Sequence, residues 1–233
     1  MPWWTYESRQ AVPGRGQDGT AGRPGKDGMM AGLDQIKEAV RNMMEELFDG
    51  VEERDLIMRS LAEHMGVTDV SVIVDVAFES GFRNATEYPL LHFLVTVAQN
   101  VPEALVDNIK ASLNDLNTVL AVGGFPSFGA FTYYPRLNQI FLSYRLPVNP
   151  TSPEEEIPNI RYYLGVLVQE LDMFVDFIMF LCDEDGNLPD LDTYLDYLNE
   201  VQDPDDLEER IRILEDKIQA MDEKWSEDGK TEE

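Results

Sequence analysis

The sequence predicts an α+β fold in which one antiparallel sheet packs against helices. Two strand-like runs lie near the middle of the chain. In residues 70–78, valines and a phenylalanine occupy every second position, which is the period of a strand with one buried face. Residues 90–97 are apolar on both faces, and this pattern predicts a strand at the centre of the sheet. Helical periodicity before and after these runs completes the α+β pattern.

Residues 33–65 predict one or two helices, because apolar residues recur there at helical spacing. Gly50 divides the segment and Gly66 is a good terminator. The predicted buried positions are Leu33, Ile36, Val40, Met43, Met44, Leu47 and Phe48, continued by Val51, Leu56, Ile57, Leu61 and Met65.

A second helix follows the central strand. Asn100 before Pro102 and Glu103 is typical of a helix start, and Gly123 begins a glycine pair that ends it. Its predicted buried stripe is Leu105, Ile109, Leu113, Leu116 and Leu120.

Two short strands come next. The first lies around Phe131 and the second runs from Ile140 to Leu146, with a turn at residues 135–138 between them. Pro147 ends the second strand.

A long helix is predicted from Ser152 to about residue 181, with a cap, a proline and acids at its start. Its second half is apolar nearly all round, so it has to be covered by a tail or by a second subunit. We therefore predict a partner or dimer surface at Met173, Phe174, Phe177 and Phe180.

Two extensions flank the predicted domain at residues 30–182. Residues 1–29 form a tail in which glycine recurs every third position from Gly16 to Gly28, a collagen-like pattern that also fits a flexible linker. Residues 183–233 form an acidic extension with a heptad helix at about 205–225. The heptad pattern fits a short coiled coil and a helix packed on the domain equally well. The seam positions of this helix are Leu207, Ile211, Leu214, Ile218 and Met221.

The formal net charge is −27, and most of it lies in residues 151–233. Such a field repels phosphate backbones, which argues against nucleic-acid binding; an acidic decoy of nucleic acid stays an alternative. The most apolar window, residues 162–182, contains Glu170, Asp172 and Asp176, which would be costly in a bilayer. It predicts a buried helix, no membrane partner and a cytoplasmic protein.

The sequence offers no pattern of enzymatic chemistry. It has no glycine-rich phosphate loop and no nucleophile elbow, and its two histidines, His64 and His92, fall on different elements. The single cysteine, Cys182, excludes a disulfide within the chain and a cysteine cluster for zinc. The acids at 183–190 lack the glycine and glutamate of a calcium loop. We expect no enzyme activity, no cofactor and no metal.

A resemblance to a known family adds to this pattern. Its residues are the Asn114–Asn117 element, the Gly129–Tyr133 strand, the strand ending at Leu146–Pro147 and the long apolar helix. They resemble the type III secretion chaperone-like fold, in particular its YbjN-type branch, over about residues 33–182. The resemblance implies a small, acidic, usually dimeric, non-enzymatic protein.

Two functions are therefore expected from the sequence. The first is a chaperone-like or adaptor protein that dimerises and binds a protein client through apolar surfaces. The second is a structural component of a phage or secretion assembly, which would oligomerise through the collagen-like tail and the heptad helix.

Overall fold

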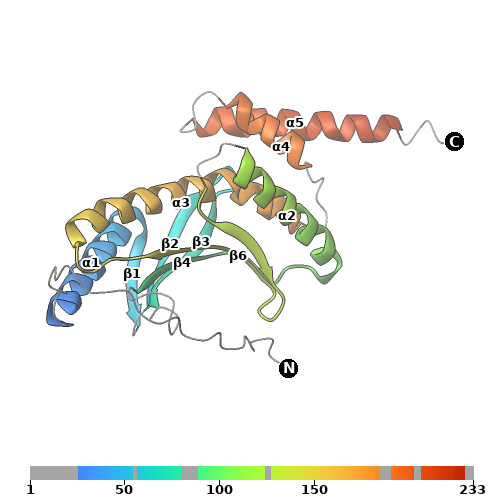
Figure 1. Ribbon diagram of the computed structural model, residues 1–233. Helices are drawn as coiled ribbons and strands as arrows, with labels where there is room; N and C mark the ends of the chain where they lie inside the picture. Colours follow the sequence, from blue (N-terminus) through green and yellow to red (C-terminus); the bar gives the residue numbers. More distant parts are fainter. Residues whose placement is uncertain are drawn as a thin grey trace, which may run out of the picture.

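The computed structural model describes residues 26–54, 57–79, 89–123, 127–183, 190–201 and 206–228. Within these ranges the chain forms five α-helices, one short 3-10 helix and a six-stranded antiparallel sheet, so the predicted α+β class is confirmed (Figure 1). In chain order the elements are α1 (Lys26–Leu47), β1 (Asp49–Arg54), β2 (Ile57–Met65), β3 (Val70–Glu79), β4 (Leu90–Gln99), η1 (Glu103–Leu105), α2 (Val106–Val122), β5 (Ala130–Tyr134), β6 (Gln139–Pro147), α3 (Pro153–Leu181), α4 (Leu191–Glu200) and α5 (Leu207–Asp228).

The sheet has the strand order β1-β2-β3-β4-β6-β5. The predicted strand at 90–97 is β4, and it lies between β3 and β6 as expected for a central strand. Helices α1 and α3 lie over one face of the sheet, and α2 lies beside β5 (Figure 1). Helices α4 and α5 follow on the far side of α3 from the sheet.

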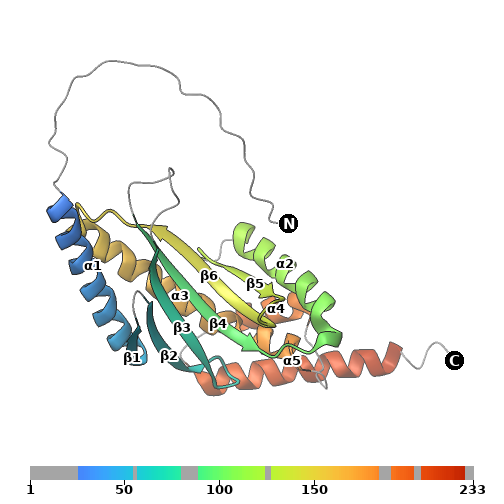
Figure 2. The same ribbon diagram turned by 90° about the horizontal axis from the view of Figure 1, so that it is seen from below.

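The two faces of the sheet differ in their cover. We call the face under α1 and α3 the covered face; its register aligns Val74, Val95 and Leu142, all fully buried. The opposite face carries Ile73, Leu94 and other partly exposed side chains of β2–β6, and we call it the bare face. In Figure 2, which views the molecule from below, no described helix lies in front of these strands.

Several predicted positions are confirmed. The strand at 70–78 is β3, and its alternating residues Val72, Val74, Val76 and Phe78 are buried. In α2 the predicted stripe is buried at Ile109, Leu113, Leu116 and Leu120, while Leu105 is half-buried in η1. The turn at 135–138 joins β5 to β6, and α3 begins at Pro153 after Ser152.

The predicted helix across 51–65 is wrong, because residues 51–54 and 57–65 belong to strands β1 and β2, which pair antiparallel; Leu56 lies outside the described residues. The side chains that β2 turns toward the covered face are Met58, Ser60 and Ala62. Two of these three are small, so the alternation is invisible to an apolar count, while Ile57, Leu61 and Met65 happen to fall at helical spacing. The backbone then changes direction at Gly66, where φ is +67°.

Two boundaries also differ from prediction. Helix α1 begins at Lys26, so the last residues of the predicted tail, including Gly28, are helical; residues 1–25 lie outside the described ranges. Asn100 is not a helix cap, because it has a φ of +56° and η1 starts after Pro102. The turn predicted at Gly81, Arg83 and Asn84 lies outside the described residues.

Each edge of the sheet is protected in a different way. The Asn117 amide of α2 donates to the carbonyl of Phe131 in β5 (2.8 Å) and accepts from its N–H (2.9 Å). It therefore replaces a neighbouring strand at that residue of the edge strand. At the other edge β1 carries Glu52, Glu53 and Arg54 and a register shift, features that discourage pairing with another chain.

Candidate functional site

A groove lies between α3 and the helical extension formed by α4 and α5. Its volume is about 550 Å³, within the range of ligand and peptide pockets. Gly165 on α3 opens one wall, and a Cβ at that position would meet no atom within 4 Å. The other lining residues are Met65, Val168, Gln169, Asp172, Met173, Leu198, Val201 and Arg210.

The sequence of α3 explains the composition of the groove. Residues 165, 168, 169, 172 and 173 share one side of the helix, because they recur at spacings of three and four. Along this side the residues change from glycine and valine to Asp172 and Met173. The α4 wall adds Leu198 and Val201, so the groove is apolar with polar groups at one end.

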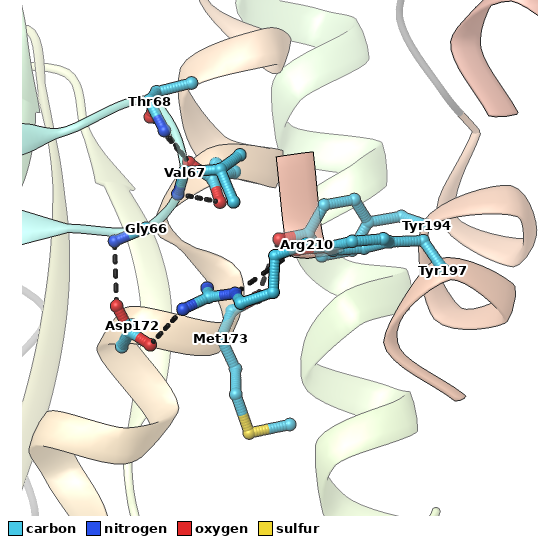
Figure 3. Close-up of polar contacts among 9 residues, drawn as sticks. Gly66, Val67, Thr68, Asp172, Met173, Tyr194, Tyr197 and Arg210 are labelled. Atoms are coloured by element: carbon cyan, nitrogen blue, oxygen red, sulfur yellow. Dashed lines mark hydrogen bonds and ion pairs between the residues drawn. The ribbon is translucent and has the colours of Figure 1, made fainter. Parts of the chain in front are cut away.

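Those polar groups form a network that joins three parts of the chain (Figure 3). Arg210 of α5 donates to the Asp172 carboxylate over 3.1 Å and to the Tyr197 hydroxyl over 3.4 Å. The other oxygen of Asp172 accepts from the N–H of Gly66 over 2.8 Å. One carboxylate therefore connects α3, the β2–β3 turn and α5.

A second carboxylate, Asp176, lies one turn further along α3 and is fully buried. It accepts hydrogen bonds from the N–H groups of Val67 and Thr68, each over 2.9 Å, and from the Thr68 hydroxyl. Only glycine fits at position 66, because a Cβ there would lie 2.4 Å from an Asp176 oxygen. The turn is thus held close against α3.

Burial and charge set the protonation of this network. Burial lowers the pKa of the Arg210 guanidinium, but the hydrogen bond with Tyr197 and the charge of Asp172 outweigh burial, so the pKa is raised. Burial, together with the charge of Asp176, raises the pKa of Tyr194 well above its usual value. At neutral pH Arg210 is therefore a cation, and Tyr194 and Tyr197, whose pKa burial also raises, are neutral phenols.

The structure overturns part of the predicted partner surface. Phe174 and Phe177 are each 1% exposed, because α4 covers them within the same chain. The ring of Tyr194 lies 5.3 Å from that of Phe177 and 6.3 Å from that of Phe174, measured between centroids. Met173 lines the groove and Phe180 is half-buried, so only these two stay accessible.

The predicted oligomerisation helix is also corrected in part. In the first half of α5 the buried side chains are Arg210, Ile213 and Leu214, and this half packs against α4. Of the predicted seam, Leu214 is buried, Ile211 is half-buried and Leu207 is 49% exposed. The side chains of Ile218 and Met221 lie outside the described residues. This half of α5 is therefore a helix packed on the domain.

The remaining candidate residues have structural partners. His92 is buried as expected, with its ring nitrogens 2.8 Å from Glu79 and 3.0 Å from Ser143. His64 is on β2, two strands away from β4, which carries His92. Burial raises the pKa of the Cys182 thiol to about 11, which leaves little of the reactive thiolate at neutral pH.

Two further observations concern metal binding and membrane crossing. No group of three or more histidine, cysteine or acidic residues in the described ranges could hold a metal ion. Among the same residues, no helix combines the length and the apolar character that crossing a bilayer requires.

The sequence indicated only some of the residues at the polar end of the groove. Asp172 and Asp176 on an apolar helix were a usable signal, because buried carboxylates need donors. Nothing in the sequence identified Arg210 and the turn at Gly66 as those donors, since they lie 38 and 106 positions away from Asp172.

Comparisons with protein-family models, with curated proteins and with solved structures found no match. The resemblance to the type III secretion chaperone-like fold therefore stays a prediction.

Proposed function

We propose that this protein is a non-enzymatic, chaperone-like or adaptor protein of the cytoplasm that dimerises and binds a segment of a partner protein through apolar surfaces. The observation that carries the proposal is the groove between α3 and α4–α5. It is an open, mostly apolar channel with a polar end, which is the form that accepts an extended or helical peptide.

The charge of the chain indicates the kind of segment. With a net charge of −27, the protein attracts basic partners and repels acidic ones over long distances. A segment with apolar side chains for Val168, Met173 and Leu198, flanked by lysine or arginine, fits both the groove and the field.

Gly165 offers a sharp test. Gly165→Trp would place an indole in the groove, and Gly165→Ala would add only a methyl group into open space. Peptides selected from a displayed random library on the wild-type protein would be measured by fluorescence anisotropy. We expect Gly165→Trp to weaken binding by at least about tenfold, the equivalent of about 1.4 kcal/mol, and Gly165→Ala to bind like the wild type.

The alanine variant is also a folding control. Replacing an exposed helical glycine by alanine stabilises a helix by up to about 1 kcal/mol, so its melting temperature should rise. The proposal fails if the library yields no specific peptide, or if folded Gly165→Trp binds the selected peptides as tightly as the wild type.

The assembly component stays a second proposal because of one observation. Helix α5 continues well past α4 toward the C-terminus and projects from the rest of the molecule (Figure 1). A trimer by light scattering that is lost on deletion of residues 1–29 or 205–225 would favour this function over the adaptor.

A further inference from the structure

The bare face of the sheet carries more apolar surface than a solvent-facing sheet requires. Antiparallel sheets with one solvated face usually show polar residues there. Here the register aligns Leu61, Ile73 and Phe141 of β2, β3 and β6, with the polar Thr96 of β4 between the last two. Leu94 lies in the next row, and the Tyr134 ring packs 6.5 Å from that of Phe141. We call Leu61, Ile73, Leu94, Tyr134 and Phe141 the apolar band.

The edge of this face is open. Ile57 is 45% exposed and Tyr134 is 42% exposed. Between β1 and β3 the surface forms a depression of about 390 Å³, lined in part by Val51, Leu61 and Ile73. The bare face therefore combines an apolar band with an uneven edge, a form suited to a shape-complementary contact.

Most charges on the bare face are paired with an opposite charge. On strands β2–β6 its paired positions carry four charged side chains, two arginines and two acids. Arg59 lies 2.7 Å from Asp75, and Arg145 lies 3.4 Å from Glu79. At the edge, Glu52 and Arg54 of β1 pair with each other over 3.2 Å. Asp49 of β1, opposite Leu61, leaves this face with one acid in excess, in a chain of net charge −27.

We propose that the bare face is the interface of a symmetric homodimer, in which the apolar bands of two copies of this chain stack. Two copies of so acidic a protein repel each other across most of their surfaces. They meet at least electrostatic cost where the net charge of each is smallest. A basic partner would instead be attracted to the acidic surfaces, so the low net charge of this face favours a second copy.

The size of the face agrees with a dimer. Four of its strands have nine or ten residues and two have five or six. At about 3.3 Å per residue and about 4.8 Å between strands, they span about 780 Å². Stable interfaces bury about 800 Å² per partner. A two-fold axis through the face makes the contact self-complementary and closed.

This inference deepens the proposed function, whose adaptor is a dimer, and it is tested separately from the groove. Light scattering on the full chain should give twice the 26.5 kDa of one chain. The double variant Ile57→Glu with Tyr134→Glu adds two charges at exposed positions of the face, and it should be monomeric with unchanged circular dichroism.

A matched control adds the same charge elsewhere. Met30 and Tyr162 are 59% and 60% exposed on α1 and α3, which lie over the other face. The double variant Met30→Glu with Tyr162→Glu should remain dimeric. Gly165→Trp should also remain dimeric, while the Ile57/Tyr134 variant should keep its peptide binding, so the two proposals can fail independently.

A labelling experiment avoids added charge. Ala77 lies half-buried on the bare face. The reactivity of a cysteine at this position, introduced as Ala77→Cys with Cys182→Ser, therefore shows whether the bare face is covered. Its reaction with a maleimide should slow by about tenfold as the protein concentration passes the dimer dissociation constant. A monomeric or trimeric wild type, a face variant that stays dimeric, or labelling independent of concentration would overturn the proposal.

Discussion

The two faces of the sheet are built from alternate residues of the same strands, yet they are used differently. On the covered face Val74, Phe93 and Leu142 are fully buried under α1 and α3. On the bare face Ile73, Leu94 and Phe141 alternate with charged pairs and stay partly exposed. The first face is covered by helices of the same chain, and no described helix covers the second.

The helical extension shows how an apolar surface can be covered within the same chain. Helix α3 was expected to need a partner because its second half is apolar all round, and α4 meets that need within the chain. Tyr194 and Tyr197 are fully buried there, and the Tyr194 hydroxyl donates to the carbonyl of Met173 over 2.7 Å. An apolar helix face therefore identifies a contact, and the structure is needed to say whether that contact is internal.

The largest expected difference between the two faces is in the stability lost when a phenylalanine on each face is replaced by alanine. Phe93→Ala on the covered face should lower the free energy of unfolding by about 3–5 kcal/mol, because it leaves a cavity in a closed core. Phe141→Ala on the bare face should cost about 1 kcal/mol in dilute solution, since its ring is already partly exposed.

Urea unfolding at two protein concentrations measures both variants and sharpens the comparison. If the bare face is a dimer interface, the cost of Phe141→Ala should grow with protein concentration, while that of Phe93→Ala should not. Equal losses for the two variants would show that the bare face is packed as closely as the covered one.

A smaller difference is expected between two aspartates that serve the β2–β3 turn. In Asp176→Asn, an amide N–H₂ would face the donors of Val67 or Thr68, so we expect a loss of about 2 kcal/mol. Asp69→Asn is the control on the turn itself. Asp69 pairs with His64 in an exposed position, and asparagine tolerates its φ of +54°.

Thermal unfolding monitored by circular dichroism is the measurement for this pair. The control should stay within about 0.5 kcal/mol of the wild type. If both variants lose the same stability, the attachment of the turn to α3 contributes nothing beyond the turn itself.

The sequence predicted the parts of the fold in which burial and apolarity coincide. Strands β3 and β4 were visible because valine, leucine and phenylalanine occupy their buried positions, and α2 was visible through its leucine stripe. The β1–β2 hairpin was missed because Ser60 and Ala62 fill its buried positions. Periodicity detects apolar side chains, and small residues under a helix leave no such signal.

The candidate site was less predictable, because its groups are distant in sequence. The acids of α3 stand out on an apolar helix, but Arg210 falls between seam positions of the predicted heptad helix, and only the structure shows it on the packed side of α5. A tyrosine pair at 194 and 197, spaced three apart, was the available signal that α4 would cover α3. Long-range pairing of this kind depends on topology, which local periodicity does not contain.

The smallest effect concerns one carboxylate on the covered side. Glu170 is 2% exposed, accepts from the Ser127 hydroxyl over 3.0 Å, and has its second oxygen without a hydrogen-bond partner in the described residues. Burial raises the pKa of this carboxyl, against the lowering effect of its hydrogen-bond donors. The unfolded chain therefore releases the proton first, and stability falls as the pH rises from the unfolded pKa through the folded one.

Glu170→Gln removes that penalty and keeps the shape of the side chain. We expect it to raise the free energy of unfolding by about 1 kcal/mol at neutral pH, with the gain shrinking as the pH falls below the unfolded pKa, where both states of the wild type hold the proton. Urea unfolding at several pH values measures this slope, and Glu155→Gln at the exposed start of α3 is the control. A gain that does not change with pH would mean that ionising the buried Glu170 carboxyl costs no stability. The polar contacts of Glu170 would then compensate fully for its burial.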